Sequence, residues 1–117
     1  MNNMPTRLRG ELGKDPLYTK GYCIYHDAVH GPATKIEWHH NFIFAGKQVQ
    51  ERWCILPIDE TIHAKANQKQ VRERLDWIML NRADNDTLVG YSRAANLIRK
   101  RDQLNETYGT PSKKQRS

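Results

Sequence analysis

The chain has 117 residues, 38% of them hydrophobic, and its mean hydropathy is -0.86. This length supports one domain with a modest core and is too short for two. No apolar run approaches the roughly 18 residues of a membrane span, and the N-terminal residues lack the apolar core of a signal peptide, so we expect a cytoplasmic protein. The net charge of +6 favours a polyanionic partner, with nucleic acid ahead of an acidic membrane surface.

The N-terminal third combines a polar start with two short strand signals. Residues 1–16 carry prolines and glycines among charged residues, which predicts a loosely ordered arm. Residues 17–109 then form the single domain. Aromatic and β-branched residues predict a short strand over 17–26, and the turn residues His30-Gly31-Pro32 follow it. The next strand is expected over Thr34–His39.

The middle of the chain predicts a β-hairpin followed by a helix. A turn at Ala45–Lys47 joins the preceding strand to the apolar run Trp53–Ile58. Pro57 has no N–H to donate, so it suits the end of that strand or the loop after it. Asp59 is the expected N-cap of a helix that starts at Glu60.

The C-terminal half predicts two helices. One carries an apolar stripe at helical spacing and runs to about residue 82, either continuous or bent near Asn67; the stripe is Val71, Leu75, Ile78 and Met79. Asp86 is expected to cap a final helix that ends before Gly109. Residues 110–117 are a basic tail with no reason to fold. The fold class is therefore α+β, with a β-hairpin and helix as its core and additional C-terminal helices.

Histidines concentrate on the predicted hairpin and helix. His39 and His40 follow an apolar-leaning strand, where adjacent imidazoles indicate function rather than a surface pair. His63 and Asn67 stand four residues apart, which places them about one turn apart on one helix face. Glu37 is expected to face solvent or a nearby lysine, with a supporting contact to a metal ligand as the alternative. Three or four metal-capable side chains are therefore expected to converge.

The order of histidine pair, glycine turn, Leu-Pro and capped helical histidine resembles the ββα-metal motif of HNH (His-Me finger) endonucleases, over about 31 of the 117 residues. The resemblance implies that His39, His63 and Asn67 hold one divalent cation (Mg²⁺, Mn²⁺ or Zn²⁺) and that His40 is the general base in hydrolysis of a phosphodiester bond. Cys54 stands nine residues before His63, where the family has an asparagine that ties the loop. Because a thiol is a weak hydrogen-bonding group, either the loop is held by other contacts or the register is shifted by one residue and Trp53 takes this position.

The structural zinc of many such relatives is not expected here. Those relatives carry two CxxC knuckles, whereas this chain has Cys23-x-x-His26 and then Asp59 and Ile62 at the second pair of positions. A complete Cys/His four-ligand site cannot be built from those positions, and both thiols of the chain are expected to be reduced. The alternative ligand set, by residue type alone, is Cys23, His26, His30 and Cys54.

Basic residues flank the motif and together predict a positive rim for a phosphodiester backbone. They are Lys47, Arg52, Lys65, Lys69, Arg72 and Arg74. DNA is therefore the expected partner, and the small size with one nuclease motif is typical of phage or mobile-element proteins. Two alternatives stay open: a catalytically silent nucleic-acid-binding accessory protein, and a small histidine-rich or toxin-like domain with a protein partner.

Overall fold

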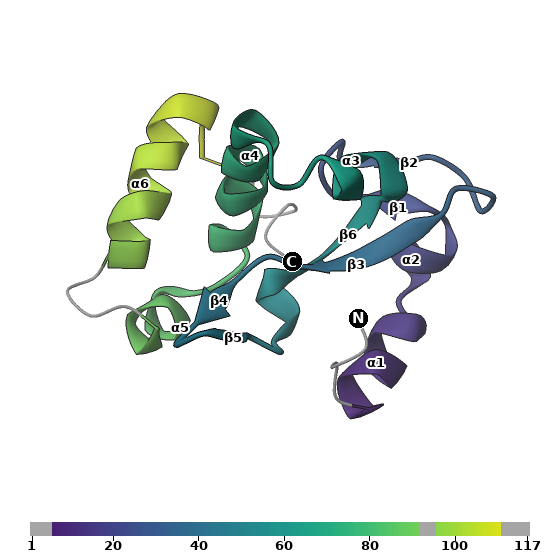
Figure 1. Ribbon diagram of the computed structural model, residues 1–117, viewed down its shortest axis with the longest axis horizontal. Helices are drawn as coiled ribbons and strands as arrows, with labels where there is room; N and C mark the ends of the chain where they lie inside the picture. Colours follow the sequence, from purple (N-terminus) through teal and green to yellow (C-terminus); the bar gives the residue numbers. More distant parts are fainter. Residues whose placement is uncertain (1–5, 92–95, 111–117) are drawn as a thin grey trace.

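The structure, a computed structural model, describes residues 6–91 and 96–110. It combines short antiparallel strand pairs with helices, which confirms the predicted α+β class. The central pair is β3 (Ile36–His40) and β6 (Ile55–Asp59). Figure 1 shows the C-terminal helices on one side of this pair and the N-terminal helices on the other.

Strands β3 and β6 form the expected hairpin arms. They pair antiparallel, with Ile36 opposite Asp59 and His40 opposite Ile55, and all of β6 is buried. Pro57 lies in the middle of β6 rather than at its end, where the sequence predicted it. Its carbonyl accepts a hydrogen bond from the Ile24 N–H (2.8 Å). Because the N and O atoms of one strand residue face the same edge, the missing N–H faces away from β3 and costs that ladder nothing.

The connection between these arms holds a second, smaller hairpin. It consists of β4 (Ile43–Phe44) and β5 (Lys47–Gln48). Ala45 and Gly46 between them have φ values of 54° and 79°, the left-handed pair that a two-residue hairpin turn requires. The predicted turn is confirmed, and a 3₁₀ turn, η1 (Arg52–Cys54), leads into β6.

Helix α3 (Glu60–Ala64) begins as predicted. The Asp59 carboxylate Oδ1 accepts from the Ile62 N–H at 2.8 Å, which caps the helix. The chain then turns and starts a separate helix, α4 (Lys69–Leu80), so the continuous helix considered from the sequence is absent. The apolar stripe of α4 faces the core, where Leu75 is fully buried.

The C-terminal region differs in detail from its prediction. It forms α5 (Asn85–Gly90) and α6 (Asn96–Tyr108), with residues 92–95 outside the described part. The cap of α5 is Asp84 rather than Asp86, because Asp84 has extended backbone angles and accepts from the Thr87 N–H at 2.7 Å. Gly109 follows α6 with φ 91°, as expected of a helix end.

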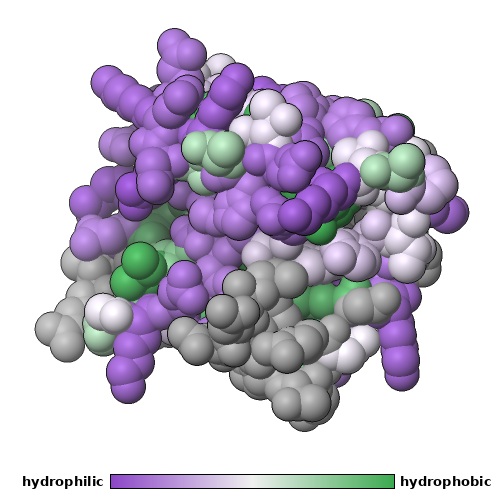
Figure 2. All heavy atoms as spheres, turned by 45° about the vertical axis from the view of Figure 1, so that its right-hand side comes forward, coloured by the Kyte–Doolittle hydropathy of each residue, from purple (hydrophilic) through white to green (hydrophobic). Residues whose placement is uncertain are grey.

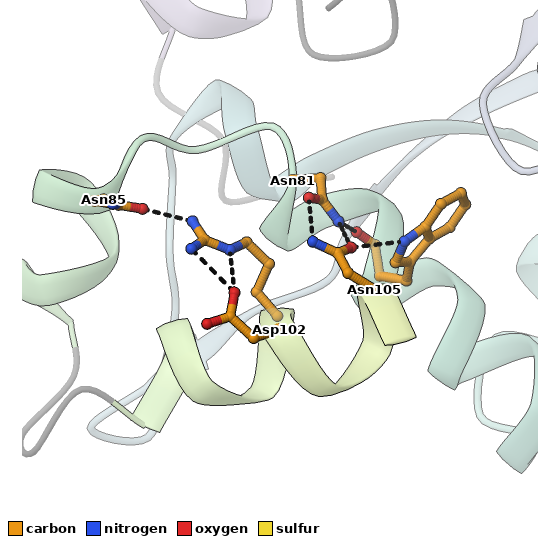
Figure 3. A network of polar contacts seen from close by, with 6 residues as sticks. Asn81, Asn85, Asp102 and Asn105 are labelled. Carbon is orange, nitrogen blue, oxygen red and sulfur yellow. Dashed lines mark hydrogen bonds and ion pairs between the residues drawn. The ribbon is translucent and has the colours of Figure 1, made fainter. Parts of the chain in front are cut away.

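A polar network locks α6 against α4, next to the apolar contacts of Leu104. Asn81 and Asn105 exchange hydrogen bonds of 2.8 and 3.2 Å, and the Trp77 indole N–H donates to Asn105 at 3.0 Å (Figure 3). Asn81 is buried, so these partners satisfy an amide that would otherwise be costly. The network holds the helix pair that forms one wall of the candidate site.

The prediction of a loosely ordered arm over residues 1–16 is wrong from residue 6 onwards, and residues 1–5 lie outside the described part. Residues Thr6–Gly13 form α1, followed by α2 (Pro16–Thr19), β1 (Tyr22–Cys23) and β2 (Ala28–Val29). The i, i+4 leucines Leu8 and Leu12 are buried in a cluster with Trp38 and Ile55. This contact covers the face of β3 away from α3, which the local sequence gave no reason to expect. The strand predicted over 17–26 is reduced to β1.

The surface agrees with the polar composition. The face in Figure 2 is mostly hydrophilic, and hydrophobic residues show there only as small separate spots. Among the described residues, no helix has the length and apolar character to cross a membrane. The basic tail predicted at 110–117 lies outside the described residues from 111 onwards.

Candidate functional site

Strand β3 and helix α3 bring two predicted ligands together. The rings of His39 and His63 lie 5.1 Å apart between centroids, at an interplanar angle of 63°. Two imidazole nitrogens held about 2.1 Å from one tetrahedral zinc ion put their ring centres roughly 5 Å apart. The separation of the two rings therefore suits a shared cation.

Glu37 orients one of these rings. Its Oε1 atom lies 2.8 Å from Nδ1 of His63, and its Oε2 atom lies 3.8 Å from the Lys35 ammonium. The lysine contact was expected, and the supporting contact to a candidate ligand was the alternative. With Nδ1 donating to the carboxylate, His63 keeps Nε2 as its lone-pair nitrogen, the arrangement common to histidine ligands of metals.

His39 is held by a chain of hydrogen bonds that the sequence did not predict. Its Nε2 atom lies 3.1 Å from Oδ1 of Asn41, whose amide donates to Asp76 at 3.0 Å. Lys100 pairs with the other Asp76 oxygen, also at 3.0 Å. Burial lowers the pKa of His39, and the nearby His63 lowers it further, so the ring favours its neutral, metal-binding form. Asn41 stands next to the histidine pair, but Asp76 and Lys100 carry no sequence signal.

His40 lies in the wall of a cleft of about 260 Å³ that also contains His39 and Asn67. The His40 Nε2 atom is 2.9 Å from Oε1 of Gln50, so with this amide orientation Nε2 carries the hydrogen and Nδ1 is the accepting nitrogen. Neither Gln50 nor its distance could be read from sequence spacing. The two neighbouring histidines thus have different partners, which permits different roles.

Asn67 is not placed as the sequence predicted. Helix α3 ends at Ala64, so Asn67 sits in the exposed turn before α4 and not one helical turn beyond His63. The reason is local, since the Lys65 N–H bonds back to Ile62 and ends the helix there. Asn67 nevertheless lines the same cleft as His39.

The predicted basic residues do not all lie at the cleft. Arg72 lines the cleft, and Lys65 and Lys69 lie exposed at the end of α3 and the start of α4. Lys47 is exposed on the small hairpin, whereas Arg52 pairs with Asp15 at 3.3 Å. Lys100, which the sequence analysis did not include, also lines the cleft.

A second cluster of metal-capable groups lies at the other end of α3. Cys23, His26, His30 and Asp59 each offer one ligand atom, and these atoms all lie within 4.8 Å of one another. The group could hold a metal ion, although it is not the complete Cys/His set of the family, because one of its four members is the carboxylate of Asp59. The alternative ligand set from the sequence analysis contained three of these four residues, but it had Cys54 in place of Asp59. Strand β6 lies beside the β1–β2 hairpin, where the Ile24 N–H donates to the Pro57 carbonyl and the Asp59 N–H contacts Sγ of Cys23, a neighbourhood that sequence spacing could not reveal.

No family model, curated protein or solved structure matches this chain. Evidence for its function therefore comes from the geometry and chemistry of the site itself.

Cys54 ties the loop before β6. It is fully buried, and its Sγ atom lies 3.4 Å from the Val49 carbonyl and 3.3 Å from the Glu51 carbonyl. Burial raises the pKa of this thiol to about 11. Cys54 thus contacts the loop backbone at the position where the HNH motif has an asparagine. Both Cys54 and Cys23 are free cysteines.

Proposed function

We propose that this protein is a metal-dependent endonuclease of the HNH type that hydrolyses phosphodiester bonds of DNA in the cytoplasm of a host cell. One observation carries the proposal. The antiparallel β3–β6 pair and the capped helix α3 hold His39 and His63 with ring centres 5.1 Å apart, and His40, next to His39 in β3, lines the same cleft as His39. Origin in a phage or mobile element fits the size and is part of the same proposal.

The donor set fits a divalent cation. His39 and His63 would supply two imidazole nitrogens, and the Asn67 amide oxygen is the third candidate donor from the cleft wall. Such a mixed nitrogen and oxygen set accepts Mg²⁺, Mn²⁺ or Zn²⁺. When bound, the cation would supply positive charge against the phosphate oxygens and the leaving oxygen.

His40 would act as the general base. Gln50 fixes the ring with Nε2–H as donor, so Nδ1 takes the proton of the attacking water. The water oxygen forms a bond to phosphorus while the bond from phosphorus to the leaving oxygen breaks, and solvent protonates that oxygen. Glu37 and Asn41 would keep the two candidate ligands in place through their hydrogen bonds.

The substrate would be bound through its backbone. Arg72 and Lys100 line the cleft, and Lys65 and Lys69 extend the positive charge along the neighbouring surface. Contacts of this kind read phosphates rather than base sequence, so binding should weaken steeply as salt rises.

The test is metal-dependent nicking of supercoiled plasmid DNA by the full-length chain. We expect nicking with Mg²⁺ or Mn²⁺, none with EDTA, and nicking by His40→Ala that is at least about 100-fold slower at equal protein concentration. Retention of the same DNA by His40→Ala in a gel shift controls for binding. If the wild-type chain retains DNA with every metal and never nicks it, the protein is the silent nucleic-acid-binding accessory and the proposal fails.

A further inference from the structure

Three ligand atoms of the second cluster already form a triangle. His26 Nδ1 and His30 Nε2 are 3.2 Å apart, and the Asp59 Oδ2 atom lies 3.3 Å from the first and 3.5 Å from the second. Ligand atoms about 2.0–2.1 Å from a tetrahedral zinc ion lie roughly 3.4 Å from one another. The triangle therefore has the size of one face of a zinc tetrahedron.

Hydrogen bonds alone do not satisfy this triangle. If both ring nitrogens carry hydrogen, both can donate to the Asp59 oxygen, but two N–H groups then face each other across 3.2 Å. If only one of the two ring nitrogens carries hydrogen, the lone pair of the other nitrogen faces the Asp59 carboxylate with no proton between them. A cation at the centre attracts all three atoms at once.

Cys23 supplies the fourth ligand atom of the group. The residue is fully buried, and its Sγ atom accepts a hydrogen bond from the Asp59 N–H at 3.5 Å. A thiolate, two imidazoles and one carboxylate form a set that suits zinc.

We propose that Cys23, His26, His30 and Asp59 bind one structural zinc ion, which ties the β1–β2 hairpin to the start of α3. The ligand set is distinct from the proposed catalytic residues and the inference does not depend on the nuclease proposal. Cys23 and Asp59 are 36 residues apart, so the ion closes a long loop that the small core alone must otherwise hold.

The ion would also set the position of the catalytic helix. Asp59 Oδ1 caps α3 through the Ile62 N–H at 2.8 Å, while Oδ2 faces the two histidines of the cluster. One carboxylate therefore links the zinc site to the helix that carries His63. Loss of zinc should loosen the first turn of α3.

The decisive measurement uses Co²⁺ in place of zinc in the full-length chain. Cobalt bound by a thiolate gives a sulfur-to-cobalt charge-transfer band, and His39 and His63 bring no sulfur to their own site. We expect the band in the wild-type chain, its loss in Cys23→Ser and its retention in Cys54→Ser, a matched control because both cysteines are fully buried. Absence of the band in the folded wild-type chain, or its loss in Cys54→Ser alone, overturns the proposal.

A second variant pair decides the matter if Cys23→Ser fails to fold. Asp59→Asn keeps an oxygen to cap α3 but removes the charged zinc ligand, and Asp84→Asn makes the same change at the cap of α5, away from the cluster. Competition with a chromophoric chelator should show zinc affinity at least about 10-fold lower in Asp59→Asn and unchanged in Asp84→Asn. Equal affinities in the two variants overturn the proposal. Nicking activity enters neither test, so a failed nuclease assay leaves both readouts intact.

Discussion

Removing the Glu37 carboxylate tests whether His63 is a metal ligand that Glu37 orients through a hydrogen bond to Nδ1. The carboxylate Oε1 lies 2.8 Å from Nδ1 of His63, and the two side chains are 32% and 37% exposed. A contact this exposed between a histidine and a carboxylate adds only about 0–1 kcal/mol to folding stability. Groups that orient a metal-bound histidine, in contrast, cost about 10–100-fold in metal affinity when removed.

Glu37→Ala should therefore weaken divalent metal binding at the His39–His63 site by about 10–100-fold, which corresponds to about 1.4–2.7 kcal/mol. Its free energy of unfolding should change by less than about 1 kcal/mol. Glu37→Gln should fall between Glu37→Ala and the wild type, because it keeps an oxygen to accept from Nδ1–H but loses the charge.

Mn²⁺ is the suitable probe, since it disfavours the thiolate of the second cluster. Its binding can be followed by loss of the free-ion electron paramagnetic resonance signal, and urea unfolding gives the stability. Glu60→Ala is the matched control: Glu60 also lies near Lys35, at 4.0 Å, on the exposed first turn of α3. If Glu37→Ala and Glu60→Ala bind Mn²⁺ equally well, Glu37 does not orient a ligand and the reasoning is refuted.

The remaining predictions concern the histidine pair, the N-terminal helix and the buried thiol. His40→Ala should lower the nicking rate by about 10²–10⁴-fold with near-normal metal binding. His39→Ala should instead lose metal affinity and regain part of its nicking rate in excess metal. Identical metal titrations of the two variants would contradict the assignment of His40 as base and His39 as ligand. Leu12→Ala should cost about 2–5 kcal/mol in urea unfolding because Leu12 is only 2% exposed, while an undocked arm would leave stability unchanged. Cys54, with its pKa raised to about 11 by burial, should resist iodoacetamide at pH 8 until the chain unfolds, since only the thiolate reacts; rapid alkylation of the native chain would show that the loop opens.

Local signals in the sequence were sufficient for the elements whose geometry depends on neighbouring residues. The turn at Ala45–Gly46, the Asp59 cap and the stripe of Val71, Leu75 and Met79 all appear where the sequence predicts them. Each depends on contacts within about one turn of the chain, so residue type and spacing contain the necessary information. The α+β class follows from the same periodicities.

Long-range contacts decided the parts that were missed. Leu8 and Leu12 fold into α1 because Trp38 offers them a surface, and Pro57 is accepted inside β6 because its N atom faces away from β3. A polar N-terminal segment or an isolated proline does not encode either contact. Tertiary packing overrode the local preference in both cases.

The candidate site divides in the same way. The sequence alone singled out His39, His40 and His63, since an imidazole pair and a helical histidine stand out by type and spacing. Only the tertiary structure placed Glu37 behind His63 and brought Asp59 to Cys23, contacts that span 26 and 36 residues. Both follow from the register of β3 against β6 and from how the β1–β2 hairpin packs on β6. That register is set by burial of whole strand faces, a property of the assembled core that no short stretch of sequence contains.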